Sequence, residues 1–278
     1  MSTGTEIKKG DGHVSVTSAV RAALQSFKVR PVYFEKDLDI QHEGDKPGYV
    51  YLVQSGWMYS YALLANGQRQ ILFLHQPGDM AGFADMGGHH SICALRSLSD
   101  CVLHPIPMAA FTSPQFLTPA IATFFLHKAG EMQSVLIRTL MAVGRMGARD
   151  RIIWLLLMLH DRLGDSAQGD EMRLPFNQSE LGDLIGLTNV SVSKYMTQLS
   201  TEGFIERKGQ RIVLRRRAEL QRMISYEPLG FPSDILLHDT PPANWADSSR
   251  QYSCTKPAAV SRSVPLMKMD EQDGWDGN

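Results

Sequence analysis

The chain has 278 residues, of which 43% are hydrophobic and 21% are charged, and its formal net charge is -1. This length accommodates two domains with separate cores, and the composition is typical of a soluble globular protein. A near-neutral charge excludes a chain that is basic throughout, so a nucleic-acid-binding function would have to lie in a local basic region.

The cysteines and apolar segments exclude several other classes. Cys93, Cys101 and Cys254 are scattered, and none belongs to a Cys-x-x-Cys pair. We therefore expect no disulfide framework, zinc site or cysteine-ligated iron–sulfur cluster. Residues 1–12 lack the apolar core of a signal peptide, and the longest apolar run, residues 152–159, is too short to span a bilayer. We expect a cytoplasmic protein without a membrane partner.

The N-terminal part predicts an antiparallel β-roll. Residues 1–18 are polar and predict a flexible arm, while residues 20–27 have the apolar spacing of a short helix. From residue 29 to residue 107, short apolar runs alternate with turn signals at even intervals. Asn66-Gly67 lies between two such runs and is typical of a hairpin.

Residues 80–92 interrupt the pattern of the roll with several glycines and the pair His89-His90. We expect a loop or a short helix here, close to the cavity of the roll. Strands resume at residues 92–95 and 101–106, and Pro107 ends the roll.

A long helix is predicted to begin at Thr118-Pro119, where a capping hydroxyl precedes proline at the first helical position. Apolar residues then step by four and three positions along one stripe. Such a stripe packs against the chain's own roll or against a second copy of the helix, and a helix this long has room for both. We expect a dimer interface that contains Ile121, Phe125, Met132, Leu136 and Leu140.

A helix-turn-helix follows a hinge at residues 144–147 and a second amphipathic helix at residues 148–163. Asn177 can cap the first helix of the motif, and Glu180 can complete a capping box. Gly186 then permits a sharp turn before the next helix.

The second helix of the motif has one apolar face and one polar face. Val192, Met196 and Leu199 lie at i, i+4 and i+7 and must face inward. The opposite face carries small polar residues, an amide and a cation, which suit the major groove of DNA. These DNA-binding candidates are Asn189, Val190, Ser191, Ser193, Lys194 and Gln198.

Residues 204–214 alternate around Gly209 and predict a two-stranded wing. The wing and the residues after it are crowded with cations, which only Glu202 and Glu206 oppose: Arg207, Lys208, Arg211, Arg215, Arg216 and Arg217. We expect DNA-phosphate contacts from the wing residues Arg207, Lys208 and Arg211.

Together these elements predict an α+β fold with an N-terminal antiparallel β-roll, a long dimerisation helix and a C-terminal winged helix-turn-helix. The expected boundaries are 1–18 for the arm, 19–115 for the roll, 116–146 for the dimerisation helix, 147–222 for the DNA-binding domain and 223–278 for a disordered tail rich in proline and serine.

This order of elements resembles the Crp/Fnr superfamily of bacterial transcription regulators over residues 29–218. The motifs that carry the resemblance are Glu43-Gly44-Asp45, residues 50–56, Gln70-Ile71-Leu72, Pro77-Gly78-Asp79, residues 148–152 and residues 181–188. Trp57 and the recognition helix are most similar to an alphaproteobacterial branch without an assigned effector. The resemblance implies a cyclic-nucleotide-binding-like sensor roll, a homodimer on an inverted repeat of double-stranded DNA, and RNA polymerase as a partner.

The resemblance also indicates an effector pocket. Family members that bind cyclic nucleotides carry Gly-Glu and Arg-Ser in the roll, and the matching positions here are Gly82-Phe83 and His90-Ser91. Phe83 cannot accept a hydrogen bond from ribose, and His90 is a weaker substitute for a bidentate arginine. These changes argue against cyclic AMP, so the effector stays unknown.

Other sensing chemistry stays open at this point. A haem would need an axial ligand such as His75, His89 or His90, and Cys93 or Cys101 could act as a redox sensor. Lone histidines of loops are usually surface residues, and cysteines of strands are usually buried and inert.

Three functions therefore remain. The first is a homodimeric DNA-binding transcription regulator whose roll transmits an unidentified signal to the recognition helices. The second is a regulator of the same fold that needs no effector. The third is a cupin-like metal-binding enzyme, but adjacent His89-His90 would point to opposite faces of a strand. We expect no catalytic residue and no metal site.

Overall fold

The computed structural model describes residues 20, 23–25, 27–163 and 170–229. The predicted arm at residues 1–18, the polar segment at residues 164–169 and the tail from residue 230 onward lie outside the described residues. No helix in the described ranges combines the length and apolar content that are needed to cross a bilayer.

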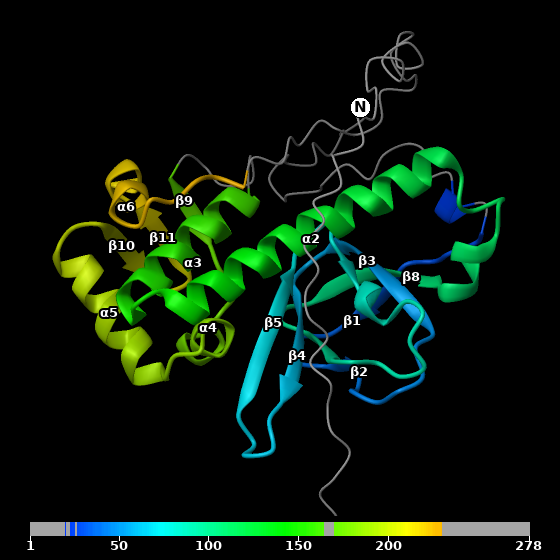
Figure 1. The fold of residues 1–278 in the computed structure, drawn as a ribbon, viewed down its shortest axis with the longest axis horizontal. Coiled ribbons are helices and arrows are strands. Elements are labelled where there is room, and N and C mark those ends of the chain that lie inside the picture. Colours follow the sequence, from blue (N-terminus) through cyan, green and yellow to red (C-terminus); the bar gives the residue numbers. More distant parts are fainter. Residues whose placement is uncertain (1–19, 21–22, 26, 164–169, 230–278) are drawn as a thin grey trace, which may run out of the picture. The chain divides into compact units, whose positions relative to one another are not determined.

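The N-terminal domain is the predicted antiparallel β-roll, built from two four-stranded sheets (Figure 1). One sheet has the order β1-β8-β3-β6, and the other has the order β2-β7-β4-β5. The strands are β1 (Val32–Phe34), β2 (Asp39–Gln41), β3 (Tyr49–Ser55), β4 (Met58–Leu63), β5 (Arg69–His75), β6 (Met80–Ala81), β7 (Ala94–Ser97) and β8 (Cys101–Pro107). Two short 3-10 helices, η1 (Phe83–Asp85) and η2 (Met108–Thr112), complete this domain.

Two glycine turns determine how the strands of the roll connect. Gly67 has a φ of +80° in the predicted hairpin, where Leu63 of β4 pairs with Arg69 of β5. Gly56 has a φ of +82°, and a Cβ at this position would lie 2.1 Å from the carbonyl oxygen of Asp100. The turn between β3 and β4 therefore requires glycine, both for its backbone conformation and for the close approach of β8.

The long helix α2 (Pro119–Arg145) begins as predicted, because Thr118 caps it and proline occupies its first position. It ends before the extended residue Met146, and α3 (Ala148–Leu163) starts two residues later. This break lies within the predicted hinge.

The two ends of α2 differ in what covers the apolar stripe. Ile121 and Phe125 are only 1% and 4% exposed, because they pack with η2, Phe116 and the N-terminal residues Val20 and Leu24 in one core. Their prediction as dimer-interface residues is therefore wrong. Met132 is partly buried against the second core, whereas Leu136 and Leu140 are exposed.

The C-terminal part contains α3, α4 (Gln178–Ile185), α5 (Asn189–Thr201) and α6 (Arg217–Met223). Its sheet has three strands, β9 (Glu171–Arg173), β10 (Ile205–Lys208) and β11 (Arg211–Leu214), in the order β10-β11-β9. The predicted wing corresponds to β10 and β11, and the sequence analysis missed β9. The tail was also predicted to start too early, because Ile224, Tyr226 and Leu229 pack against the core of this part.

Candidate nucleic-acid interface

The first helix of the motif, α4, is stabilised by a capping box at its N-terminus and by close packing against the turn that follows it. Asn177 accepts a hydrogen bond from the backbone of Glu180 at 2.9 Å, and Glu180 accepts one from the backbone of Asn177 at 2.8 Å. This capping box was predicted and is confirmed. A Cβ at Gly182 would lie 2.4 Å from the carbonyl oxygen of Leu187, so α4 and the turn approach each other more closely than alanine allows.

The second helix, α5, presents a polar face to solvent. Val192, Met196 and Leu199 are buried, as their spacing predicts. Asn189, Val190 and Lys194 are exposed, and Val190 keeps 79% of its surface accessible. Because an exposed valine contributes little to folding, its position between an amide and a cation favours a contact with a base edge.

Three of the predicted α5 residues are less free than expected. Ser191 and Ser193 are half-buried, and Ser191 accepts a hydrogen bond from the Thr188 hydroxyl at 3.0 Å. The Gln198 amide donates to Glu202 at 2.8 Å. The exposed Thr197, one turn beyond Lys194, was missed, although its spacing of seven residues from Val190 could have identified it.

The tip of the wing carries two exposed cations. Arg207 and Lys208 are exposed beside Gly209, and neither forms an ion pair with any residue that the structure describes. Their charges are therefore available to DNA phosphates.

The base of the wing carries paired arginines instead. Arg211 forms a bidentate pair with Glu171 of β9, with distances of 2.5 Å from Nε to Oε1 and 2.6 Å from Nη2 to Oε2. Arg215 pairs with Glu206 across the hairpin. The predicted phosphate contact of Arg211 would require this arginine to leave its carboxylate or to share it.

The next two arginines have structural contacts as well. Arg216 lies 3.8 Å above the centre of the Phe204 ring. Arg217 pairs with Asp170 at 3.0 Å. The sequence analysis identified only Glu202 and Glu206 as opposing charges, because Asp170 and Glu171 are distant along the chain.

The β4–β5 hairpin of the roll contacts α4. The Arg69 guanidinium pairs with Asp183 at 2.7 Å and also donates to the Tyr59 hydroxyl at 2.7 Å. The amide of Gln70 donates to the backbone oxygen of Asp183 at 2.7 Å. A movement of this hairpin would therefore act directly on the first helix of the motif.

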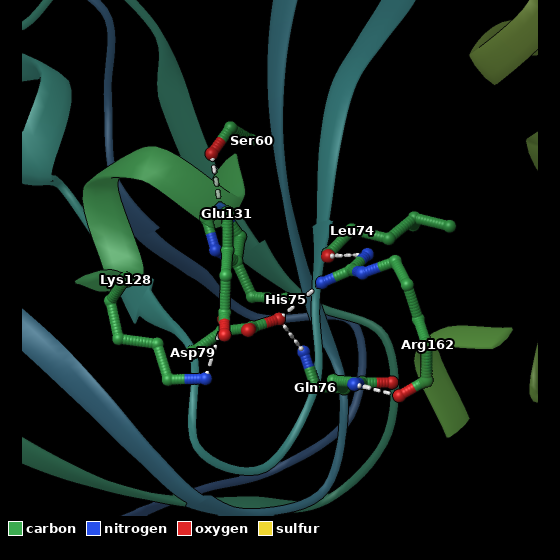
Figure 2. A network of polar contacts seen from close by, with 8 residues as sticks. All are labelled: Ser60, Leu74, His75, Gln76, Asp79, Lys128, Glu131 and Arg162. Carbon is green, nitrogen blue, oxygen red and sulfur yellow. Dashed lines mark hydrogen bonds and ion pairs between the residues drawn. The ribbon is translucent and has the colours of Figure 1, made fainter. Parts of the chain in front are cut away.

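A second joint connects the roll to the last turn of α3. Figure 2 shows Arg162 reaching the carbonyl of Leu74, at 2.7 Å, and the carboxylate of Asp79, at 2.5 Å. The amide of Gln76 donates back to the Arg162 carbonyl at 2.5 Å. Arg162 also lies 4.6 Å above the centre of the Phe73 ring. These contacts fix the end of α3 to the turn between β5 and β6.

The predicted effector residues have different surroundings. Gly82 precedes η1, Phe83 packs against the apolar core of the roll, and the exposed His90 contacts the carbonyl of Gly44 at 3.1 Å. Ser91 is buried, and its hydroxyl has no hydrogen-bond partner among the residues that the structure describes.

A residue that sequence reasoning missed, Asp85, holds this loop in place. Its carboxylate is buried and accepts hydrogen bonds from the Gln41 amide at 2.8 Å and from the backbone of Ile92 at 2.9 Å.

Three of the candidate haem and redox residues, His75, Cys93 and Cys101, are buried in the roll, whereas His89 and His90 are exposed. His75 is buried, and its Nε2 lies 2.6 Å from the Ser60 hydroxyl (Figure 2). Burial raises the pKa of Cys93 and of Cys101 to about 11, so both thiols stay protonated and weakly reactive at neutral pH. Groups of three or more possible metal ligands do not occur among the described residues.

Two family models match the chain, one over each of the parts described above. The model for a cyclic nucleotide-binding domain matches residues 31–113, which form the roll. The model for a Crp-like helix-turn-helix domain matches residues 150–223, from α3 to the end of α6.

Curated proteins and solved structures give the same picture. The nitrogen fixation regulation protein FixK of Rhizobium meliloti is 28% identical over 67% of this chain and 82% of its own length. The regulatory protein HlyX of Actinobacillus pleuropneumoniae is 25% identical over 67% of this chain and 78% of its own. The solved structure of FixK2 from Bradyrhizobium japonicum matches with a TM-score of 0.65 and 28% identity, covering 71% of this chain and 98% of FixK2.

Proposed function

This chain belongs to the Crp/Fnr family of DNA-binding transcription regulators, and from this premise we propose that it binds an inverted-repeat site as a homodimer. The observation that carries the proposal is the exposed face of α5, with Asn189, Val190 and Lys194, next to the unpaired cations of the wing tip. Asparagine can pair with adenine, lysine with guanine, and valine with a thymine methyl group, while Arg207 and Lys208 contact phosphates.

The dimer would form along the exposed stripe of α2. This stripe contains exposed residues with alternating spacings of four and three: Leu126, Gly130, Gln133, Ile137, Leu140 and Gly144. Leu126 and Leu140 are each 73% exposed, and Leu136 and Met141 flank the stripe. This is the seven-residue repeat of a two-stranded coiled coil, and two small glycines allow close approach of the helices. Pairing here would bring two copies of α5 to successive major grooves.

Each predicted domain would have its own role. Residues 19–115 would be the sensor, residues 116–146 the dimerisation helix and residues 147–222 the DNA-binding domain, located in the cytoplasm and acting with RNA polymerase as family members do. The contacts of Arg69 with Asp183 and of Arg162 with Asp79 offer the route from roll to DNA. We include no enzymatic activity in this proposal, because the relatives named above are regulators.

A regulator without an effector is the second candidate. The apolar contacts of Phe83 favour it, because Phe83 stands where nucleotide-binding family members have the glutamate that binds ribose. Thermal-shift measurements with cyclic nucleotides and with haem test these two effector classes. A compound that binds raises the unfolding temperature and contradicts the effector-independent regulator, whereas no shift with either class supports it.

The proposed function is tested by selecting sequences from genomic DNA and measuring gel shifts with the selected fragments. We expect an inverted repeat bound by a dimer, and a dimer-breaking variant, Leu140→Glu, that loses most of this affinity. Thr123→Glu, near the other end of α2, serves as a control for added charge. A parent chain that is a strict monomer and ignores all selected fragments at low salt contradicts the proposal.

A further inference from the structure

The chain continues beyond the part that matches the Crp-like model. That match ends at residue 223, where α6 also ends, but Ile224, Tyr226 and Leu229 of the following segment pack against the core. Ser225 adopts a φ of +49°, an unusual value for serine, and reverses the chain after α6. Such a conformation persists only where surrounding contacts over-determine it.

The contacts of this segment reach both α3 and α2. The Tyr226 hydroxyl donates a hydrogen bond to the Asp161 carboxylate of α3 at 2.7 Å. The Arg138 guanidinium of α2 donates to the backbone oxygen of Glu227. Residues 226 and 227 therefore connect the two helices on either side of the break at Met146.

Asp161 is a largely buried acceptor whose hydrogen bonds come in part from this segment. Its side chain is 13% exposed. Burial raises the pKa of Asp161, but hydrogen bonds from His160, from Tyr226 and from the backbone amide of Leu229 outweigh burial and keep the pKa below its ordinary value. The carboxylate therefore stays charged, and two of its donors belong to the segment.

The last turn of α3 contacts both the roll and the segment after α6, through the adjacent residues Arg162 and Asp161. Arg162 donates hydrogen bonds to Leu74 and Asp79 of the roll, whereas Asp161 accepts one from Tyr226 in the segment after α6. A change at the segment would therefore alter how α3, and with it the recognition helix, is oriented relative to α2.

We propose that residues 224–229 form a strap that locks α3 against α2, with Tyr226 as a positioning residue that sets the orientation of the recognition helices. The inference rests on the proposed function, because orientation matters only when two recognition helices must match two half-sites. A loose joint lowers the affinity for the complete inverted repeat and leaves the binding of one half-site unchanged.

The test compares the affinity of the full chain for a selected inverted repeat and for a single half-site. Tyr226→Phe keeps the ring and removes the hydroxyl. We expect about a ten-fold loss on the inverted repeat, the size typical of a hydrogen bond to a charged acceptor, and less than a two-fold change on the half-site. Tyr49→Phe, which removes a hydroxyl from an exposed tyrosine of the roll, is the control.

A double-mutant cycle separates positioning from general stability. Asp161→Ala should lower the ratio of the two affinities as Tyr226→Phe does, and the double variant should add little further loss. An unchanged ratio in Tyr226→Phe, or equal losses on both DNAs, overturns the strap. A parent chain that binds neither DNA overturns the proposed function itself, so the two failures are distinguishable.

Discussion

The roll and the recognition helix use polar residues in opposite ways. In the roll, Ser60, His75 and Asp85 are buried, and each has a hydrogen-bond partner inside the domain. On α5, Asn189 and Lys194 face solvent. A buried polar group stabilises the fold only when it is paired, whereas an exposed one is available to a ligand. Substitutions in the roll should therefore change stability, and substitutions on α5 should change DNA binding.

The largest expected effect comes from the turn that joins the two sheets of the roll. Gly56→Ala should lower the free energy of unfolding by about 4 kcal/mol, since its Cβ meets the backbone of β8 and its φ is positive. Thermal or denaturant unfolding measures the loss. The control is Gly48→Ala, which meets no atom within 4 Å and has no positive φ. Equal stability of the two variants would contradict this account.

The second effect is a dependence of stability on pH that comes from His75. Burial lowers its pKa from 6.5 to about 4. Between pH 6.5 and pH 4, His75 is therefore protonated in the unfolded chain but neutral in the folded chain. The free energy of unfolding falls as the pH drops through this range. The loss attributable to His75 is about 3 kcal/mol.

Denaturant unfolding between pH 7 and pH 4 measures this effect. His75→Gln should flatten the dependence on pH, while His89→Gln, in an exposed loop, should leave it as in the parent chain. The assignment to His75 fails if the His75→Gln variant keeps the full slope.

The third effect lies on α5 and should leave stability untouched. Asn189→Ala and Lys194→Ala should each cost about 2 kcal/mol of specific binding per half-site, the usual size of a good base contact. Thr201→Ala, exposed at the far end of α5, is the control. Gel shifts with the selected inverted repeat measure the loss. Unchanged affinity in both α5 variants would remove the assignment of this face.

The smallest effect distinguishes the two parts of the wing. Arg207→Ala should reduce the slope of log affinity against log salt by about 0.9 for each half-site, and so by about 1.8 for the dimer on the inverted repeat, because each protomer loses one phosphate contact. Arg215→Ala should change it less, because Glu206 already neutralises this arginine. Glu206→Gln should in turn strengthen binding. Fluorescence titrations at several salt concentrations give the slopes, and identical slopes for the two arginine variants would show that the ion pair is irrelevant.

Local signals explain why much of the fold was predictable. The capping box joins Asn177 and Glu180, which are three positions apart, and the cap at Thr118 acts on the first turn of its own helix. The buried face of α5 follows from a helical period alone. Each of these features depends on residues that are close together in the chain, so each can be predicted from the sequence alone.

The candidate site was predictable only in part. The exposure of Asn189 and Lys194 followed from their spacing, but the pairing of Arg211 did not. Its partner Glu171 belongs to a strand of three residues that pairs with β11 forty residues later, and so short a strand has no periodic signal.

By itself, the sequence determined the α+β class, the order of roll, long helix and winged motif, and the inward face of each helix in the motif, because these depend on local period and capping. Only the tertiary structure decided which part of the α2 stripe is covered. Ile121 and Phe125 lie in the chain's own core, whereas Ile137 and Leu140 face outward. A helical period shows that residues share a face, but not which neighbour that face meets, because the neighbour comes from elsewhere in the chain.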